Sequence, residues 1–175
     1  MDLDITPFDI PLAQWVENFV DYLSDNFGAF FGTIADIILY LYNAVNWLFQ
    51  TPPSLIIILI FAFLAWRLKG WWFALFSALS LWFLDILGLW SHTMSTLSLV
   101  LAAVVVAIVI GLPTGIAAAR YDMVSKVVRP VLDFMQTLPA FVYLIPAIIF
   151  FGLGTVPAII ATIIFGMPPV IRFTE

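Results

Sequence analysis

The chain has 175 residues, of which 64% are hydrophobic and 10% are charged, and its mean hydropathy is +1.14. This composition is typical of an integral membrane protein and argues against a water-soluble enzyme domain. The formal net charge of −5 argues against nucleic-acid binding, which needs a basic surface, and the lack of cysteine excludes disulfides, thiolate nucleophiles and cysteine-based metal sites.

Acidic residues are concentrated in the N-terminal region, before the first basic residue, Arg67. Residues 1–11 show no periodicity and are predicted to form a tail. No catalytic motif is visible in the chain, so we expect no catalytic residue. His92 is the only histidine and is interpreted as a polar residue at a membrane boundary, so we expect no metal site.

Residues 12–27 have apolar side chains at three- and four-residue spacing, with polar side chains on the other side. This pattern predicts an amphipathic helix that lies on the membrane. Its polar face carries no lysine or arginine, so attraction to anionic lipid does not hold it there. We expect packing on the rest of the assembly to do so.

Residues 30–50 permit two interpretations. The segment is long enough to span a membrane, but polar and aromatic residues follow one helical stripe: Thr33, Asp36, Tyr40, Asn43, Trp47 and Gln50. An aspartate inside the membrane is a functional hypothesis. The alternative, which we favour, is that the stripe faces water and the helix lies in the interface.

The remaining apolar segments predict five membrane spans, at residues 55–66, 71–89, 97–119, 131–151 and 157–173. If basic residues face the cytoplasm, these spans alternate so that all six lysines and arginines lie on one side. Within the third span, Gly111, Gly115 and Ala118 form a small-residue stripe that predicts close helix packing. Arg129 and Asp133 are four residues apart, which predicts a structural ion pair at the membrane edge.

Prolines interrupt the last three spans. Each proline inside a helix removes a backbone donor and leaves a carbonyl unpaired, which hydrocarbon tolerates only where protein or a water-lined cavity supplies partners. Broken helices of this kind often line transport pathways. We therefore expect helix kinks at five positions, which are Pro113, Pro139, Pro146, Pro168 and Pro169.

A polar and small stripe is predicted along residues 131–151 if they form one helix. It consists of Gln136, Ala140, Tyr143 and Ala147. Such a stripe suits a path for a polar solute, but it also suits helix packing with interhelical hydrogen bonds, which the pattern alone favours. The pattern alone leaves both interpretations open.

The same region carries a family resemblance. Met135-Gln136-Thr137, the run Pro139 to Leu144, and Pro168-Pro169-Val170-Ile171-Arg172 resemble the core of the permease subunit of glycine betaine/proline-type ABC importers, which take up osmoprotectants. Ile110 to Ile116 is similar to the first core helix of that family. The resemblance implies an all-α polytopic membrane protein of the type I ABC importer permease kind, with N-terminal scaffold helices, in a bacterial cell membrane. It implies a substrate pathway at Gln136, Thr137, Ala140, Phe141 and Tyr143.

Further components are implied by the resemblance. They are two copies of a cytoplasmic ATP-binding subunit, an extracytoplasmic substrate-binding protein or fused domain, and a second permease copy. ATP and magnesium would bind the ATPase, so no cofactor is expected in this chain.

The resemblance also suggests three parts: scaffold helices in residues 1–53, two spans in 54–92 and the first three core helices in 93–175. In this family a cytoplasmic coupling loop with a Glu-Ala-type motif follows the helix that ends near Arg172, whereas this chain stops at Glu175. We therefore expect it to be the N-terminal part of a permease. Two alternatives are a non-transporting membrane scaffold or regulatory protein derived from such a permease, and, less favoured, a self-contained channel.

Overall fold

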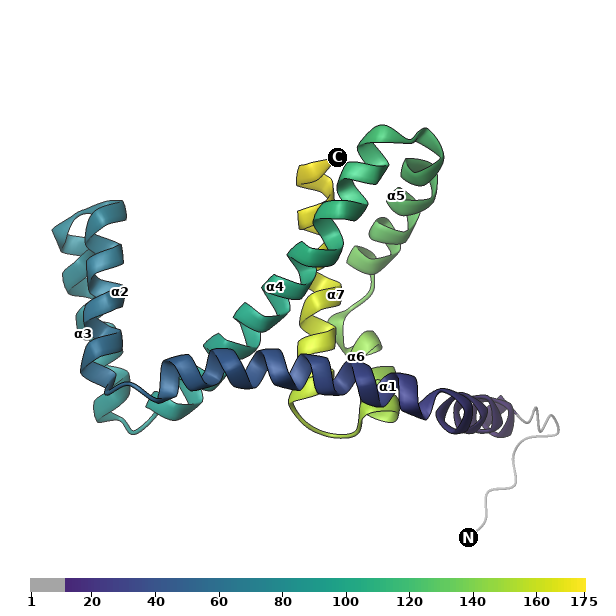
Figure 1. Ribbon diagram of the computed structural model, residues 1–175, viewed down its shortest axis with the longest axis horizontal. Helices are drawn as coiled ribbons and strands as arrows, with labels where there is room; N and C mark the ends of the chain where they lie inside the picture. The colour runs from purple at the N-terminus through teal and green to yellow at the C-terminus, as the bar shows by residue number, and fades with distance from the viewer. Residues whose placement is uncertain (1–11) are drawn as a thin grey trace, which may run out of the picture.

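The structure, a computed structural model, describes residues 12–175, apart from the side chains of Leu12, Ala13, Val16 and Ala140. Within this range the chain forms helices and no strands, which confirms the predicted all-α class (Figure 1). The helices are α1 (Leu12–Gln50), α2 (Ser54–Lys69), α3 (Trp71–Ile86), α4 (Trp90–Arg120), α5 (Asp122–Thr137), α6 (Ala140–Phe151) and α7 (Thr155–Thr174).

Helix α1 is one helix of 39 residues, so the separation of residues 12–27 from residues 30–50 is wrong. Gly28 and Gly32 are the glycines near that expected boundary, and a single glycine in a helix costs only about 1 kcal/mol. The helix ends at Gln50 because Pro52 and Pro53 lack backbone donors and restrict the residues before them.

The central part of α1 crosses α4 and the N-terminal half of α7. Ile38 of α1 belongs to a buried cluster whose other members are Ala102, Ala103, Val156, Ile159 and Ile163. The six residues of the predicted polar stripe on α1 are all exposed. In Figure 1, α1 runs across the direction of α2, α3 and α7. This arrangement agrees with the interfacial interpretation, although α1 is also long and apolar enough to cross a membrane.

Helices α2 and α3 pack on each other as a hairpin, with Gly70 between them at a φ of 90°. This φ lies in the left-handed region, which glycine adopts without strain. The hairpin stands apart from α7, and α1 joins the two along their base (Figure 1). Each hairpin helix has 16 residues, or about 24 Å, which is short for a membrane span.

Helices α4 and α7 pack closely on each other through the predicted small-residue stripe. Gly111, Gly115 and Ala118 are buried. A Cβ added at Gly111 would lie 2.9 Å from the Val170 Cγ1 atom of α7. The prediction of close helix approach at this stripe is therefore confirmed.

The predicted span at residues 131–151 is not one helix. It is divided between α5 and α6, which are bent by 98° relative to each other at the break between Thr137 and Phe141. Helices α4 and α7 are each long and apolar enough to cross a membrane, and the bent α5–α6 pair counts as a further broken span or re-entrant loop. These apolar helices fit the predicted multi-pass membrane protein.

Four of the five prolines expected to kink helices lie inside continuous helices. Pro113 lies in α4, Pro146 in α6, and Pro168 and Pro169 in α7. Kinks at these positions stay predictions. Pro139 differs, because it precedes the first residue of α6 and lies at the 98° bend between two helices.

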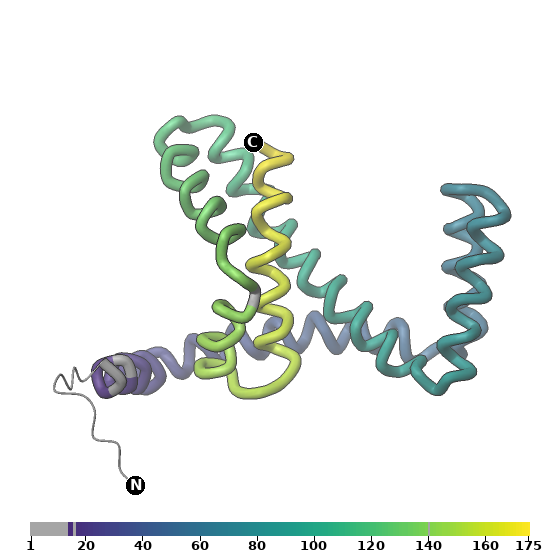
Figure 2. Tube along the Cα trace, turned by 180° about the vertical axis from the view of Figure 1, so that it is seen from behind, coloured from purple at the N-terminus to yellow at the C-terminus, as the bar shows by residue number. Residues whose placement is uncertain are grey.

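The turn between α2 and α3, the turn between α4 and α5, and the C-terminus lie at the same edge of the molecule (Figures 1 and 2). The six basic residues of the chain lie in the last turns of α2, α4 and α7 or in α5. The turn between α6 and α7 lies at the opposite edge. We expect the basic edge to face the cytoplasm, because lysine and arginine are enriched in cytoplasmic loops.

This orientation predicts the outcome of single-cysteine labelling with an impermeant maleimide in intact cells, since the chain has no native cysteine. Lys126→Cys should be protected and Leu153→Cys should label. Both positions are exposed in the structure, so access within the protein does not limit the reaction. Asp25→Cys should also label if α1 lies at the outer interface. Labelling of Lys126→Cys with protection of Leu153→Cys would reverse the orientation.

Candidate functional site

The break between α5 and α6 is caused by Pro139. Leu138, the residue before it, has φ −84° and ψ 138°, the extended conformation that a following proline favours. Helix α5 therefore ends at Thr137, and α6 begins directly after Pro139. The result is a C-terminal helix end and an N-terminal helix end that are close in sequence, in the middle of an apolar segment.

Side chains from both helices converge on one backbone carbonyl at this break. The Phe134 carbonyl oxygen accepts hydrogen bonds from the Thr137 hydroxyl at 3.0 Å and the Tyr143 hydroxyl at 3.3 Å. The Leu138 N–H also donates to it, at 3.4 Å. The structure thus brings together two of the predicted pathway residues, Thr137 and Tyr143. Their hydroxyls add two side-chain hydrogen bonds to a carbonyl that already accepts from the backbone, in the last turn of α5.

The other predicted pathway residues are arranged differently. Gln136 and Phe141 are exposed, and in the described part of the chain the Gln136 side chain makes no hydrogen bond. Ala140 begins α6, but its side chain lies outside the described residues. Gln136 and Tyr143 do not share one helical face as predicted, because the bend separates α5 from α6. The substrate pathway through these residues stays a prediction.

A charged cluster joins α5 to the end of α7. The Arg129 Nε donates to the Glu175 Oε1 at 2.8 Å, and Arg172 pairs with Asp133. These residues line an open depression of about 320 Å³. The predicted pair between Arg129 and Asp133 is therefore wrong, because α7 places an oppositely charged partner beside each of them.

Ser125 completes this cluster. Its hydroxyl donates a hydrogen bond to the Glu175 Oε1 at 2.6 Å, and the Arg129 Nε donates to the same oxygen. The Ser125 hydrogen bond, followed by the Arg129 hydrogen bond, lowers the pKa of Glu175 below its ordinary value of 4.5. Sequence reasoning missed this cross-helix pairing. Its signal was the three-residue spacing of Arg172, in the last turn of α7, and Glu175, just after it, which matches the four-residue spacing of Arg129 and Asp133.

Polar contacts also join helices at the edge of the molecule opposite the basic residues. The Gln50 Nε2 at the end of α1 donates to the Ser95 Oγ of α4 at 2.9 Å, and the Ser54 hydroxyl at the start of α2 donates to the Asp85 carboxylate of α3 at 2.9 Å. Among the described residues, no group of three or more histidine, aspartate and glutamate side chains could hold a metal ion.

These features define a helical membrane protein with a polar helix break between α5 and α6. No family model matches the chain. It is 44% identical over 165 residues to the glycine betaine transport system permease protein OpuAB of Bacillus subtilis, covering 94% of this chain and 58% of the relative.

Two further relatives extend this similarity. The glycine betaine/carnitine transport permease protein GbuB of Listeria monocytogenes is 44% identical over 95% of this chain and 60% of the relative. The glycine betaine/proline betaine transport system permease protein ProW of Escherichia coli is 42% identical over 94% of this chain and 47% of the relative. The chain thus spans about half to three fifths of the length of these curated relatives.

The chain is homologous, over nearly all of its length, to the permease proteins of glycine betaine transport systems. This confirms the resemblance predicted from the motifs around Gln136 and Pro168. The relatives are transport permeases and not enzymes, and the chain is an integral membrane protein like them.

Proposed function

We propose that this chain forms part of the permease subunit of an ABC importer for glycine betaine, proline or related quaternary ammonium compatible solutes. The observation that carries the proposal is identity of 42–44% to three such permeases across 94–95% of the chain. The solute would cross between this subunit and a second permease copy, and its uptake would protect the cell against osmotic stress.

The break between α5 and α6 suits a zwitterionic solute. The end of α5 presents backbone carbonyls, the negative end of a helix, and the start of α6 presents backbone N–H groups, the positive end. Discontinuous helices in transporters place such ends at their binding sites. In this proposal the carbonyl end of α5 would attract the quaternary ammonium group and the amide end of α6 the carboxylate.

The aromatic residues at the start of α6 suit the same solute. The Phe141 side chain is 74% exposed. The Tyr143 side chain is half-buried, and its hydroxyl donates a hydrogen bond to the Phe134 carbonyl. Aromatic faces attract quaternary ammonium groups, and each such contact is worth about 0.5–2 kcal/mol. Phe141 would therefore contact the solute, whereas Tyr143 and Thr137 would hold the break in shape.

The energy for import would come from other subunits. The sequence has no phosphate-cradling glycine-rich loop with lysine. We propose that two copies of a cytoplasmic ATP-binding subunit, with ATP and magnesium, bind at the basic edge of the molecule. An extracytoplasmic substrate-binding protein or fused domain would deliver the solute at the opposite edge, near the turn between α6 and α7.

The test is uptake of radiolabelled glycine betaine in a bacterial strain that lacks its own betaine transporters. The strain would express the gene's complete reading frame with its ATPase and binding protein. We expect accumulation under osmotic stress that disappears when the ATPase is inactivated. Normal membrane abundance and ATPase assembly without uptake of betaine or proline would overturn the proposal and favour the scaffold or regulatory alternative.

A further inference from the structure

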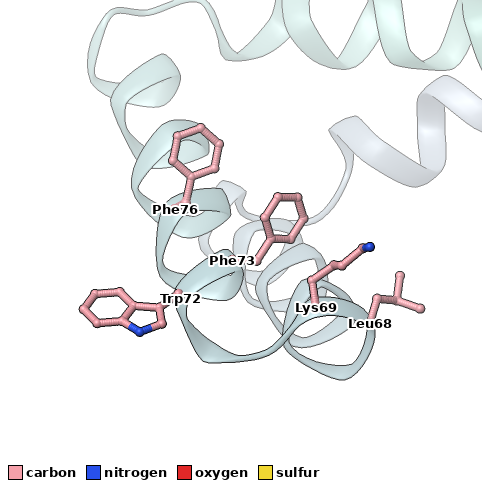
Figure 3. A pocket seen from close by; sticks show the side chains of 5 residues that line it. All are labelled: Leu68, Lys69, Trp72, Phe73 and Phe76. Carbon is pink, nitrogen blue, oxygen red and sulfur yellow. The ribbon is translucent and has the colours of Figure 1, made fainter.

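The turn of the α2–α3 hairpin forms an apolar groove with one cation at its edge. The groove has a volume of about 640 Å³ and is lined by Leu68, Lys69, Trp72, Phe73 and Phe76. Figure 3 shows the Phe73 ring between Phe76 and the Lys69 side chain. The turn that carries the groove lies at the same edge of the molecule as the α4–α5 turn and the C-terminus (Figure 1).

The cations at this turn have no acidic partner in the described part of the chain. Arg67 and Lys69 are exposed in the last turn of α2, and both ion pairs of the described residues involve other side chains. Asp85, the acidic residue of α3, is at the other end of the hairpin, where it accepts the Ser54 hydrogen bond. A positive charge beside an apolar groove complements a ligand with an anionic head and an apolar tail.

The apolar surface continues along α3. A second groove of about 440 Å³ shares Phe76 with the first and extends along Leu79, Ser80, Trp82, Phe83 and Ile86. Trp72, Phe76, Leu79 and Phe83 recur at three- and four-residue spacing, so they follow one side of the helix. From Trp72 to Phe83 the rise is about 16 Å, close to the roughly 15 Å depth of one leaflet of a bilayer core.

The start of α3 adds to the charge complementarity. No side chain caps the helix, which begins at Trp71 after Gly70, and the free N–H groups of a first helical turn attract anions such as phosphate. Trp72 and Phe73 of this first turn line the groove together with Lys69.

We propose that the α2–α3 turn binds an anionic phospholipid, with its phosphate group at Lys69 and the start of α3 and one acyl chain along the α3 grooves. The site is independent of the solute path at the α5–α6 break. Its occupant is a lipid of the leaflet at the basic edge, because Lys69 and the start of α3, which would hold the phosphate, lie at that edge and the grooves follow α3 away from it.

Brominated phosphatidylglycerol tests the headgroup contact, since bromine on an acyl chain quenches nearby tryptophan fluorescence and Trp72 lines the groove. A variant that keeps Trp72 and has phenylalanine at the other six tryptophan positions would be titrated with it in phosphatidylcholine nanodiscs. We expect Lys69→Gln to weaken the preference for phosphatidylglycerol about fivefold, the effect of one basic residue at a membrane surface. Lys126→Gln, which removes an exposed charge at the same edge, should leave the preference unchanged. An equal effect of both variants would overturn the proposal by showing only a general attraction of charge.

A matched pair of variants tests the contact with the acyl chain. Phe76→Ala removes the side chain shared by the two grooves, whereas Leu75→Ala removes an exposed neighbour that lines neither. We expect Phe76→Ala to reduce quenching by both brominated phosphatidylglycerol and brominated phosphatidylcholine, and Leu75→Ala to leave it near wild type. If Phe76→Ala instead converts a dimer to a monomer with quenching unchanged, the groove holds a second copy of the chain and the lipid assignment is wrong.

Discussion

Gly115→Leu should abolish accumulation of correctly folded protein. A Cβ at position 115 would lie 2.6 Å from the Thr174 Cβ and 2.9 Å from the Ile171 carbonyl oxygen, both on α7. The carbonyl belongs to the helix backbone and cannot move aside as a side chain can. Overpacking a close contact typically costs 1–3 kcal/mol or more, and Leu adds three carbons beyond Cβ. The measurement is membrane abundance and the thermal unfolding midpoint of the purified chain in detergent.

Gly32→Leu is the matched control for this prediction. Gly32 is also helical, but nothing lies within 4 Å of a Cβ at its position. It should accumulate like wild type, because its new side chain meets open space. Gly115→Ala should give an intermediate midpoint, since it adds only the clashing Cβ. Wild-type abundance and midpoint for Gly115→Leu would show that the α4–α7 contact is not formed as described.

Gln136→Leu should lower glycine betaine uptake about fivefold in the complete transporter, with little change in abundance. The Gln136 side chain is exposed at the end of α5, beside the helix break, and in the described part of the chain it makes no hydrogen bond. Its removal therefore costs the fold little. In the proposed pathway it would hydrogen-bond a charged solute, and one such bond is worth about 1 kcal/mol or more. Initial uptake rates, normalised to the amount of protein in the membrane, provide the measurement.

Gln50→Leu serves as the contrasting variant. The Gln50 amide bonds to Ser95 on α4 at 2.9 Å and to Asn46 at 3.0 Å, so its loss should lower abundance and the unfolding midpoint. Uptake per molecule should stay near wild type, because Gln50 lies at the far end of α1 from the break. If Gln136→Leu lowers abundance as much as uptake, or leaves uptake unchanged, Gln136 belongs to a packing surface and the pathway assignment is wrong.

The sequence by itself determined the class of protein and much of its close packing. High apolar content and segment length are sufficient to predict membrane helices, because hydrocarbon requires every backbone polar group to be paired within the segment. The stripe of Gly111, Gly115 and Ala118 predicted the α4 face that meets α7, because a missing side chain is a local property that any close neighbour can use. The motifs around Gln136 and Pro168 were specific enough to indicate the homologous permeases.

The tertiary structure decided those features that depend on which segments of the chain are in contact. A proline inside an apolar run indicates a kink or a break equally well, and only the structure shows that Pro139 lies at a 98° bend whereas Pro146 lies within α6. Charges four residues apart favour a local pair only until another helix brings better partners, as α7 does for Arg129 and Asp133. The hydrogen bond from Tyr143 to the Phe134 carbonyl gave no sequence signal at all, because the bend between α5 and α6 brings that hydroxyl to the carbonyl.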